Sequence, residues 1–399
     1  MKITDIRWAA LAGNFDWLVV RVDTDEGLYG WGECFWGVGV NEMLRTMKPL
    51  LIGENPMDVG RLYEKLIRSM SGVGSLAGTS VTAITAVEFA LWDITGKALG
   101  APVYQLLGGR HRERVRLYAD CHAGESLESD TEARRITVRD KTKACARATH
   151  TPEAYAARAK EVLAAGWTAL KFDLDVPLAW QHDAFNRCLS NGQLAQMEAV
   201  VAAVREAVGP ETDICFDCHW AFNVNDAIKL ADRLTKYEIM WLEDPIPAEN
   251  IDALVKVTQD TKTPICTGEN YFRKFGFKEL IEKQAVDIVS PDISRLGGLL
   301  EAFKIAALAD MYYIPVAPHN ITGPIGTFAA AHLSAAIPNF LVMEFHAMDV
   351  DWFEDLIAQD EPVIREGYFH FTGKPGLGIE IDDDVARAHL LPGEKWFDE

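Results

Sequence analysis

Several features that would assign the 399-residue chain to a membrane or disulfide-rich class are missing. No apolar stretch without a charged residue reaches eighteen residues, which argues against a membrane-spanning helix. The stretch from Met1 to Asp5 lacks the basic region and apolar run of a targeting signal. The seven cysteines are sparse and odd in number, which favours a reducing compartment without a disulfide framework. We therefore expect a cytoplasmic protein.

Positive charge is also scarce, because 39 Lys and Arg residues stand against 59 Asp and Glu residues, a net charge of -20. So acidic a surface repels phosphate, so neither nucleic acid nor an anionic membrane is an expected partner. The hydrophobic share of 49% is that of a globular protein, and the length suits two domains, one of which could be a barrel. The excess acid serves solubility or includes carboxylates that bind a cation, and only their positions can decide.

The two parts of the chain follow different patterns. Residues 17–22 and 28–33 predict two strands of a small sheet, and no glycine-rich phosphate loop follows the first of them. Beyond about residue 115, helical patterns alternate with short apolar strands, which is typical of a parallel sheet. We predict a modified TIM barrel, an α/β barrel, at 116–372, an α+β capping domain at 1–115, and a C-terminal segment at 373–399 that packs back on the cap.

The barrel strands can be counted by the polar residue at the end of each. These residues are Asp120, Lys171, Asp217, Glu243, Glu269, Asp292, His319 and Glu344. The last six lie about 25 residues apart, which is the length of one βα unit in an eightfold barrel. Because the carboxyl ends of barrel strands converge on one mouth, packing does not explain charged residues there.

Three successive strands are predicted to end in a carboxylate, at Asp217, Glu243 and Glu269. Three unpaired carboxylates at one mouth would repel one another and be costly to ionise. A hard divalent cation resolves this, and Mg²⁺ accepts carboxylate oxygens while leaving sites for water or substrate. The spacing therefore predicts one Mg²⁺ per subunit, held by these three residues.

Acid–base candidates lie on the same rim. Asp292 and His319 end two neighbouring strands, where the carboxylate could orient the imidazole and make it a general base, although a lone histidine is more often structural. His219, two residues after Asp217, is a second acid or base, or a loop histidine. Lys171 could neutralise a substrate carboxylate or an enolate, or be simply solvated.

Two further acids are candidates for substrate binding. Asp173 shares the face of Lys171 by strand alternation. Glu344 could hydrogen-bond to a substrate carboxylate if it is protonated, or to another group of the site. Neither role follows from the spacing alone.

Motifs over nearly the whole chain resemble the enolase superfamily, specifically its mandelate racemase-like branch. They are Lys171-Phe172-Asp173, Asp217-Cys218-His219, Trp241-Leu242-Glu243-Asp244-Pro245, Gly268-Glu269-Asn270, Asp292-Ile293-Ser294-Arg295-Leu296-Gly297-Gly298, Pro318-His319-Asn320 and Glu344. The resemblance implies that Mg²⁺ binds a substrate carboxylate and stabilises the enediolate formed when a base removes the α-proton.

Matching positions assign roles by resemblance. The metal ligands are Asp217, Glu243 and Glu269, the His–Asp dyad is His319 with Asp292, and Lys171 is the first lysine of a Lys-x-Lys pair. One departure matters, because Asp173 stands where the racemases have a second lysine, the usual second base. His219 matches the acid histidine of several sugar-acid dehydratases in this branch.

These matches lead us to expect Mg²⁺-dependent dehydration of a gluconate- or galactonate-type aldonate to a 2-keto-3-deoxy acid. His319 would remove the C2 proton, Mg²⁺ and Lys171 would stabilise the enediolate, and His219 would protonate the leaving C3 hydroxyl, unless His319 does so in a syn elimination. The alternatives are a racemase or epimerase of the same branch and a non-catalytic sugar-acid binding protein. A metal-dependent hydrolase is a further alternative, but such enzymes usually recruit histidines to the metal.

Substrate choice is expected in loops of the capping domain, which in the resembling family close over the substrate. Trp17 and Trp36 stand beside the two predicted strands of this domain, where each could stack on a sugar face or pack the seam between domains. The expected partner is the small-molecule sugar acid, and the resemblance also implies a homo-oligomer.

Overall fold

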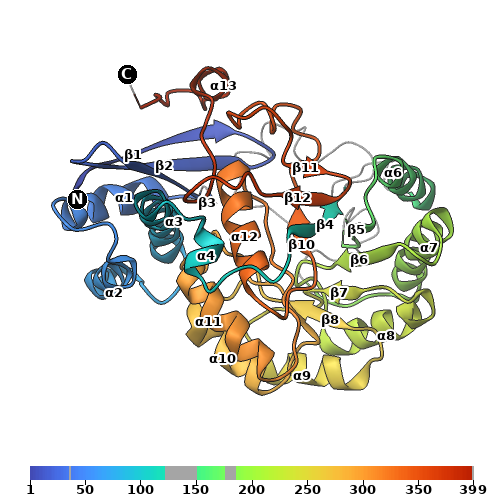
Figure 1. Ribbon diagram of the computed structural model, residues 1–399. Helices are drawn as coiled ribbons and strands as arrows, with labels where there is room; N and C mark the ends of the chain where they lie inside the picture. The colour runs from blue at the N-terminus through green and yellow to red at the C-terminus, as the bar shows by residue number, and fades with distance from the viewer. Residues whose placement is uncertain (36, 122–150, 176–185, 398–399) are drawn as a thin grey trace.

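The computed structural model describes residues 1–35, 37–121, 151–175 and 186–397 (Figure 1). The chain begins with an antiparallel sheet of β1 (Ile3–Ala12), β2 (Asp16–Thr24) and β3 (Tyr29–Phe35), in that order. The helices α1 (Val40–Leu51) and α3 (Thr79–Leu99) pack on this sheet, and α2 (Val59–Ser69) packs on α3; together these elements are the capping domain. Gly32 lets β3 lie directly on α3, because a Cβ there would stand 1.8 Å from the carbonyl oxygen of Ala86.

A parallel sheet follows, as predicted. Its strands β4 (Arg114–Asp120), β5 (Ala169–Asp173), β6 (Asp213–Asp217), β7 (Trp241–Glu243), β8 (Ile265–Thr267) and β9 (Ile288–Val289) pair in chain order. The last strand, β10 (Met343–Phe345), pairs in parallel with β4, and isolated bridges through Val316 connect β9 to Phe340. The predicted modified TIM barrel with an α+β cap is thus confirmed.

Helices surround this sheet and short elements complete the chain. They are α4 (Val103–Leu106), α6 (Pro152–Ala164), α7 (Asn191–Val208), α8 (Val224–Leu234), α9 (Ile251–Asp260), α10 (Arg273–Glu282), α11 (Leu299–Asp310), α12 (Pro324–Ala336), α13 (Asp383–Ala388), the strands β11 (Ile364–Arg365) and β12 (Tyr368–His370), and 3₁₀ turns at Ser71–Val73 and Thr235–Tyr237. Among the helices in the described ranges, none is both long and apolar enough to cross a membrane.

Three of the predicted strands are shorter than expected at their polar ends. β8 stops two residues before Glu269, β9 stops three residues before Asp292, and His319 takes part only in an isolated bridge to Asp292. Prolines explain two of the three cases, since Pro315 and Pro318 before His319, and Pro291 before Asp292, have no N–H to donate to a neighbouring strand. These polar residues therefore lie on short loops just beyond the strands.

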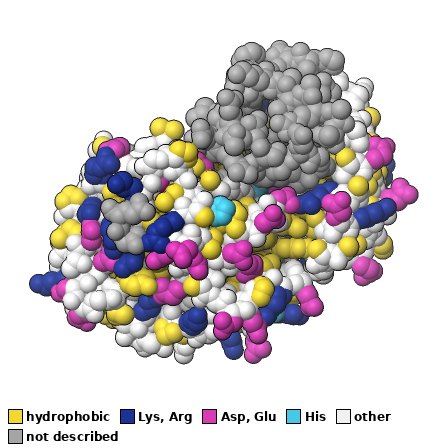
Figure 2. Space-filling model, turned by 90° about the horizontal axis from the view of Figure 1, so that it is seen from above, with side chains coloured by type: hydrophobic (Ala, Val, Ile, Leu, Met, Phe, Trp, Pro, Cys, Tyr) yellow, Lys and Arg dark blue, Asp and Glu magenta, His cyan; other side chains and the backbone are white. Residues whose placement is uncertain are grey.

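The C-terminal segment returns to the capping domain, as predicted. Leu390 forms an antiparallel bridge with Leu11 of β1, and Glu380 lies 2.9 Å from Lys97 of α3. Figure 2 shows Asp and Glu side chains spread over one face of the molecule among Lys, Arg and hydrophobic side chains. Much of the acidic excess on that face is therefore dispersed over the surface.

Candidate active site

The three predicted metal ligands converge. Asp217 and Glu243 are paired neighbours at the ends of β6 and β7, and Glu269 follows β8. One carboxylate oxygen from each lies within 4.8 Å of the other two, and all three side chains are buried. The set offers only hard oxygen donors, which are the ligands that Mg²⁺ prefers. The residues present therefore fit a divalent cation of this kind.

The charge balance of this cluster supports the same conclusion. Burial raises the pKa of Asp217, and it raises the pKa of Glu243 to about 8 despite the nearby ammonium group of Lys171. Burial acts in the same direction on Glu269, but the His319 imidazolium outweighs it and lowers the pKa of Glu269 to about 2. Two of the three carboxylates thus lack enough positive charge around them, which a bound cation would supply.

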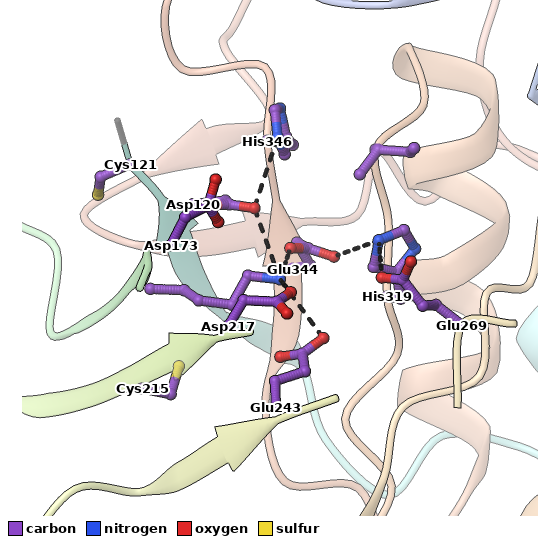
Figure 3. A network of polar contacts seen from close by, with 12 residues as sticks. Asp120, Cys121, Asp173, Cys215, Asp217, Glu243, Glu269, His319, Glu344 and His346 are labelled. Carbon is purple, nitrogen blue, oxygen red and sulfur yellow. Dashed lines mark hydrogen bonds and ion pairs between the residues drawn. The ribbon is translucent and has the colours of Figure 1, made fainter. Parts of the chain in front are cut away.

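Lys171 contacts four carboxylates, which converge in the polar network of Figure 3. Its Nζ is 2.6 Å from Glu344 Oε1 and 3.5 Å from carboxylate oxygens of Asp120, Asp217 and Glu243. Burial would lower the pKa of Lys171, but the carboxylates around it, led by Glu243 and Glu344, hold that pKa well above its usual value. Lys171 is therefore a fixed positive charge that can hold an anion rather than accept a proton.

Glu344 is an ionised partner within this network. Burial would raise its pKa, but the charges of Lys171 and His319 hold it well below the usual value. Its Oε2 also accepts the backbone N–H of Asn320 at 2.9 Å. Of the two roles expected for Glu344, the structure favours contact with other groups of the site over donation by a protonated acid.

His319 and Asp292 form a hydrogen-bonded pair. The imidazole Nδ1 lies 3.0 Å from Asp292 Oδ2, and Oδ1 of that buried carboxylate accepts the N–H and hydroxyl of Ser294. Nε2 lies 2.9 Å from Glu269 Oε2, so this nitrogen faces the carboxylate cluster. Burial would lower the pKa of His319, but Glu269 and Glu344 raise it well above the usual value.

His219 lies on a different part of the rim. It follows β6, the third barrel strand in chain order, and Nδ1 is 2.8 Å from Asp175 Oδ1. Nε2 is 3.8 Å from Asp217 Oδ2 and 3.9 Å from Asp173 Oδ1, and the side chain is 21% exposed. Burial would lower the pKa of His219, but Asp217, Asp175 and Asp173 raise it well above the usual value. These acidic surroundings favour the protonated form of His219.

Trp17, an aromatic candidate of the capping domain, is not part of this network. Trp17 is 1% exposed, and its ring packs on Trp352 and Phe353 at centroid distances of 5.0 and 6.1 Å. The structure therefore favours packing of the interdomain seam over sugar stacking for Trp17, because other rings already cover it. Trp36 lies outside the described residues.

Four polar residues at the site were not assigned a role from the sequence. Asp120 Oδ2 bridges Lys171 Nζ and His346 Nε2 at 3.5 Å each, and His346 Nδ1 is 2.9 Å from Asn14 Nδ2 of the capping domain. The fourth is Asp175, the partner of His219. Asp175 and His346 each stand two residues after a candidate, Asp173 or Glu344, so strand alternation could have indicated both. Nothing in the sequence near Asn14 indicated its contact across the domains.

A capped parallel barrel with three clustered carboxylates, a buried lysine and two histidines in carboxylate surroundings defines a class of proton-transferring, cation-binding enzymes. Residues 154–385 match the family model described as enolase C-terminal domain-like. Residues 12–108 match that of the mandelate racemase / muconate lactonizing enzyme N-terminal domain. The chain belongs to this family, within the enolase superfamily.

Named relatives and a solved structure are similar to this chain over nearly its whole length. D-xylonate dehydratase of Haloferax volcanii is 47% identical over 398 residues, which cover 100% of this chain and 91% of the relative. D-gluconate dehydratase of Thermoproteus tenax is 30% identical over 390 residues, which cover 97% of this chain and 71% of the relative. A mandelate racemase/muconate lactonizing enzyme-like protein from Rubrobacter xylanophilus has 43% identity and a TM-score of 0.91, with 99% of both chains covered.

Proposed function

We propose that the protein is a Mg²⁺-dependent hydro-lyase that converts a sugar acid of the aldonate type into a 2-keto-3-deoxy acid. One observation carries the proposal: a His–Asp pair and a second histidine, held by Asp175, both face a single cluster of three carboxylates. A dehydratase needs a base to remove a proton and an acid to protonate the leaving hydroxyl, and two histidines can divide these roles. Relatives named as dehydratases of D-xylonate and D-gluconate support this reading.

Asp217, Glu243 and Glu269 would hold the ion, which when bound supplies electrophilic stabilisation to the negative charge that develops on the substrate. Lys171 adds a fixed positive charge beside the same carboxylates, suited to the anionic end of an aldonate. Once Glu269 has a cation as its partner, it contributes less to raising the pKa of His319. The imidazole can then be neutral, as a base must be.

His319 Nε2 is the atom that takes the C2 proton, because Nδ1 is engaged by Asp292. His219 Nε2 gives its proton to the C3 hydroxyl as the C3–O bond breaks, so that water leaves, while Asp175 holds Nδ1 of the ring. The resulting enol gains a proton at C3 and loses the proton of its C2 hydroxyl, which gives the 2-keto acid. Asp173, lacking a basic nitrogen, leaves His219 as the proton donor on this side.

D-Xylonate is the first substrate to test, with D-gluconate and D-galactonate next. The experiment incubates the purified protein with Mg²⁺ and each aldonate in ²H₂O, and measures 2-keto acid and C2 deuterium. Keto acid from at least one aldonate supports the proposal. Deuterium at C2 without keto acid would instead show a racemase or epimerase, and no reaction with any aldonate would contradict the proposal.

A further inference from the structure

Two buried glutamates of the capping domain contact the barrel at the first turns of two helices. Glu33 on β3 accepts the backbone N–H groups of Gly323 at 2.5 Å and Gly326 at 2.8 Å. Glu88 on α3 accepts those of Leu299 at 2.9 Å and Leu300 at 3.0 Å. Their exposed fractions are 0% and 1%. The two carboxylates therefore occupy the N-termini of α12 and α11.

These two helices begin differently from several others of the barrel. The helices α6, α7, α8 and α9 are each capped by their own N-cap side chain, from Thr151, Ser190, Asn223 and Asn250 respectively. The N-cap residues of α11 and α12 are Gly298 and Gly323, which have no side chain to accept a first-turn N–H. Glu88 and Glu33 of the capping domain provide the side-chain acceptors that these two N-cap glycines lack.

The glycines make room for these carboxylates. A Cβ on Gly298 would lie 2.2 Å from Glu88 Oε2, and φ at this residue is +93°. A Cβ on Gly323 would lie 2.6 Å from the Trp17 ring and 2.9 Å from Glu33 Oε1. Burial raises the pKa of each glutamate to about 7, and the first-turn N–H groups oppose that rise. The positive end of each helix thus serves as the counter-charge of a buried acid.

Both helices directly follow a loop that carries one member of the His–Asp pair. Asp292 lies seven residues before the first residue of α11, and His319 five residues before that of α12. The first loop has a further tie to the cap, because Thr85 of α3 accepts the N–H of Gly297 at 3.0 Å. Figure 1 shows α12 beside β3, and contacts also join α11 to α3.

We infer that Glu33 and Glu88 are positioning residues, through which docking of the capping domain sets the placement of His319 and Asp292. The inference rests on the proposed function for the roles of these two residues. Neither glutamate contacts His319 or Asp292 directly. Each acts through a helix N-terminus and the short loop before it.

The test compares Glu33→Gln and Glu88→Gln with Glu354→Gln as a matched control. Glu354 also accepts two backbone N–H groups, from Val363 and Ile364, at 3.0 and 2.9 Å, but these residues follow no site loop. Amide hydrogen exchange should rise over residues 319–330 in the first variant and over 292–304 in the second. The control should change neither segment.

In the same variants, kcat for the aldonate and the rate of C2 deuterium exchange should fall together, on the order of tenfold to a hundredfold, with KM less affected. The control variant should keep the wild-type kcat. Wild-type kcat in both cap variants, alongside the local rise in exchange, would overturn the inference and leave a structural role only. Wild-type protein inactive on every aldonate would instead refute the proposed function, while the exchange pattern would still test the link between the domains.

Discussion

At the scale of single residues, the two histidines differ in their neighbours. His319 is paired through Nδ1 with Asp292 and turns Nε2 toward Glu269, whereas His219 lies among Asp175, Asp173 and Asp217. In the proposed mechanism, the acid for the leaving group and the base for C2 thus lie on separate elements. Substitution of His219 should therefore leave removal of the C2 proton intact.

We therefore expect His219→Asn to lower the rate of dehydration by about 10²- to 10⁴-fold, the usual contribution of a general acid. Exchange of the C2 proton with solvent should persist, because His319 and Asp292 are unchanged. The measurement follows keto-acid formation and C2 deuterium by NMR in ²H₂O, with His319→Asn, expected to lose both, as the comparison. Equal loss of both signals in His219→Asn would count against its role as the acid.

His332 offers a prediction on stability rather than catalysis. This buried residue of α12 accepts the N–H of Tyr104 at Nδ1 and contacts the carbonyl of Leu377 through Nε2, an arrangement that suits the neutral ring. Burial lowers its pKa from 6.5 to about 4. Between these values the unfolded chain binds the proton and the folded one does not, so stability falls as the pH falls below 6.5.

From pH 7 to pH 5 this single group should remove about 2 kcal/mol from the free energy of unfolding. His332→Gln, which can keep both hydrogen bonds but does not titrate, should show a correspondingly smaller loss in urea unfolding at the two pH values. The exposed His111→Gln serves as the control and should follow the wild type. If the His332 variant loses as much stability as wild type does, the buried neutral histidine is not responsible.

At the scale of elements, the close contact of β3 with α3 depends on Gly32, which has no side chain. A Cβ on Gly32 would stand 1.8 Å from a carbonyl oxygen of α3, so Gly32→Ala should push the strand away and destabilise the capping domain by roughly 1–3 kcal/mol. Gly60→Ala in α2 is the control, since its Cβ would make only an ordinary 3.5 Å contact with Leu300. Thermal unfolding of both variants checks this, and equal midpoints would refute it.

The sequence predicted elements well where the signal was local. β6 and β7 end at Asp217 and Glu243 as their apolar runs indicated, and alternation with helices predicted the parallel order. Prolines and glycines shortened the segments before Glu269, Asp292 and His319, but left these residues at the same mouth. Long-range contacts could not be predicted from the sequence, because a glycine at an N-cap does not indicate that a glutamate some 200 to 300 positions away will cap the helix.

At the scale of the whole molecule, the net charge of -20 opposes the approach of an anionic substrate, and the site offers Lys171 as a local positive charge among its carboxylates. The acidic excess has two parts with different consequences. Carboxylates spread over the surface remain hydrated. The buried group of Asp217, Glu243 and Glu269 has lost that solvent and gains most from a cation.

Binding of Mg²⁺ should therefore stabilise the folded protein, by about 2.7 kcal/mol at a concentration of 100 times its Kd, because the unfolded chain has no such site. We expect the thermal midpoint to rise with Mg²⁺ and to return after EDTA, with matched NaCl as the control for ionic strength. Asp217→Asn should abolish the shift, whereas Glu211→Gln, at an exposed acid, should leave it unchanged. An equal shift in both variants would mean that the dispersed surface charge, not the buried cluster, responds to the cation.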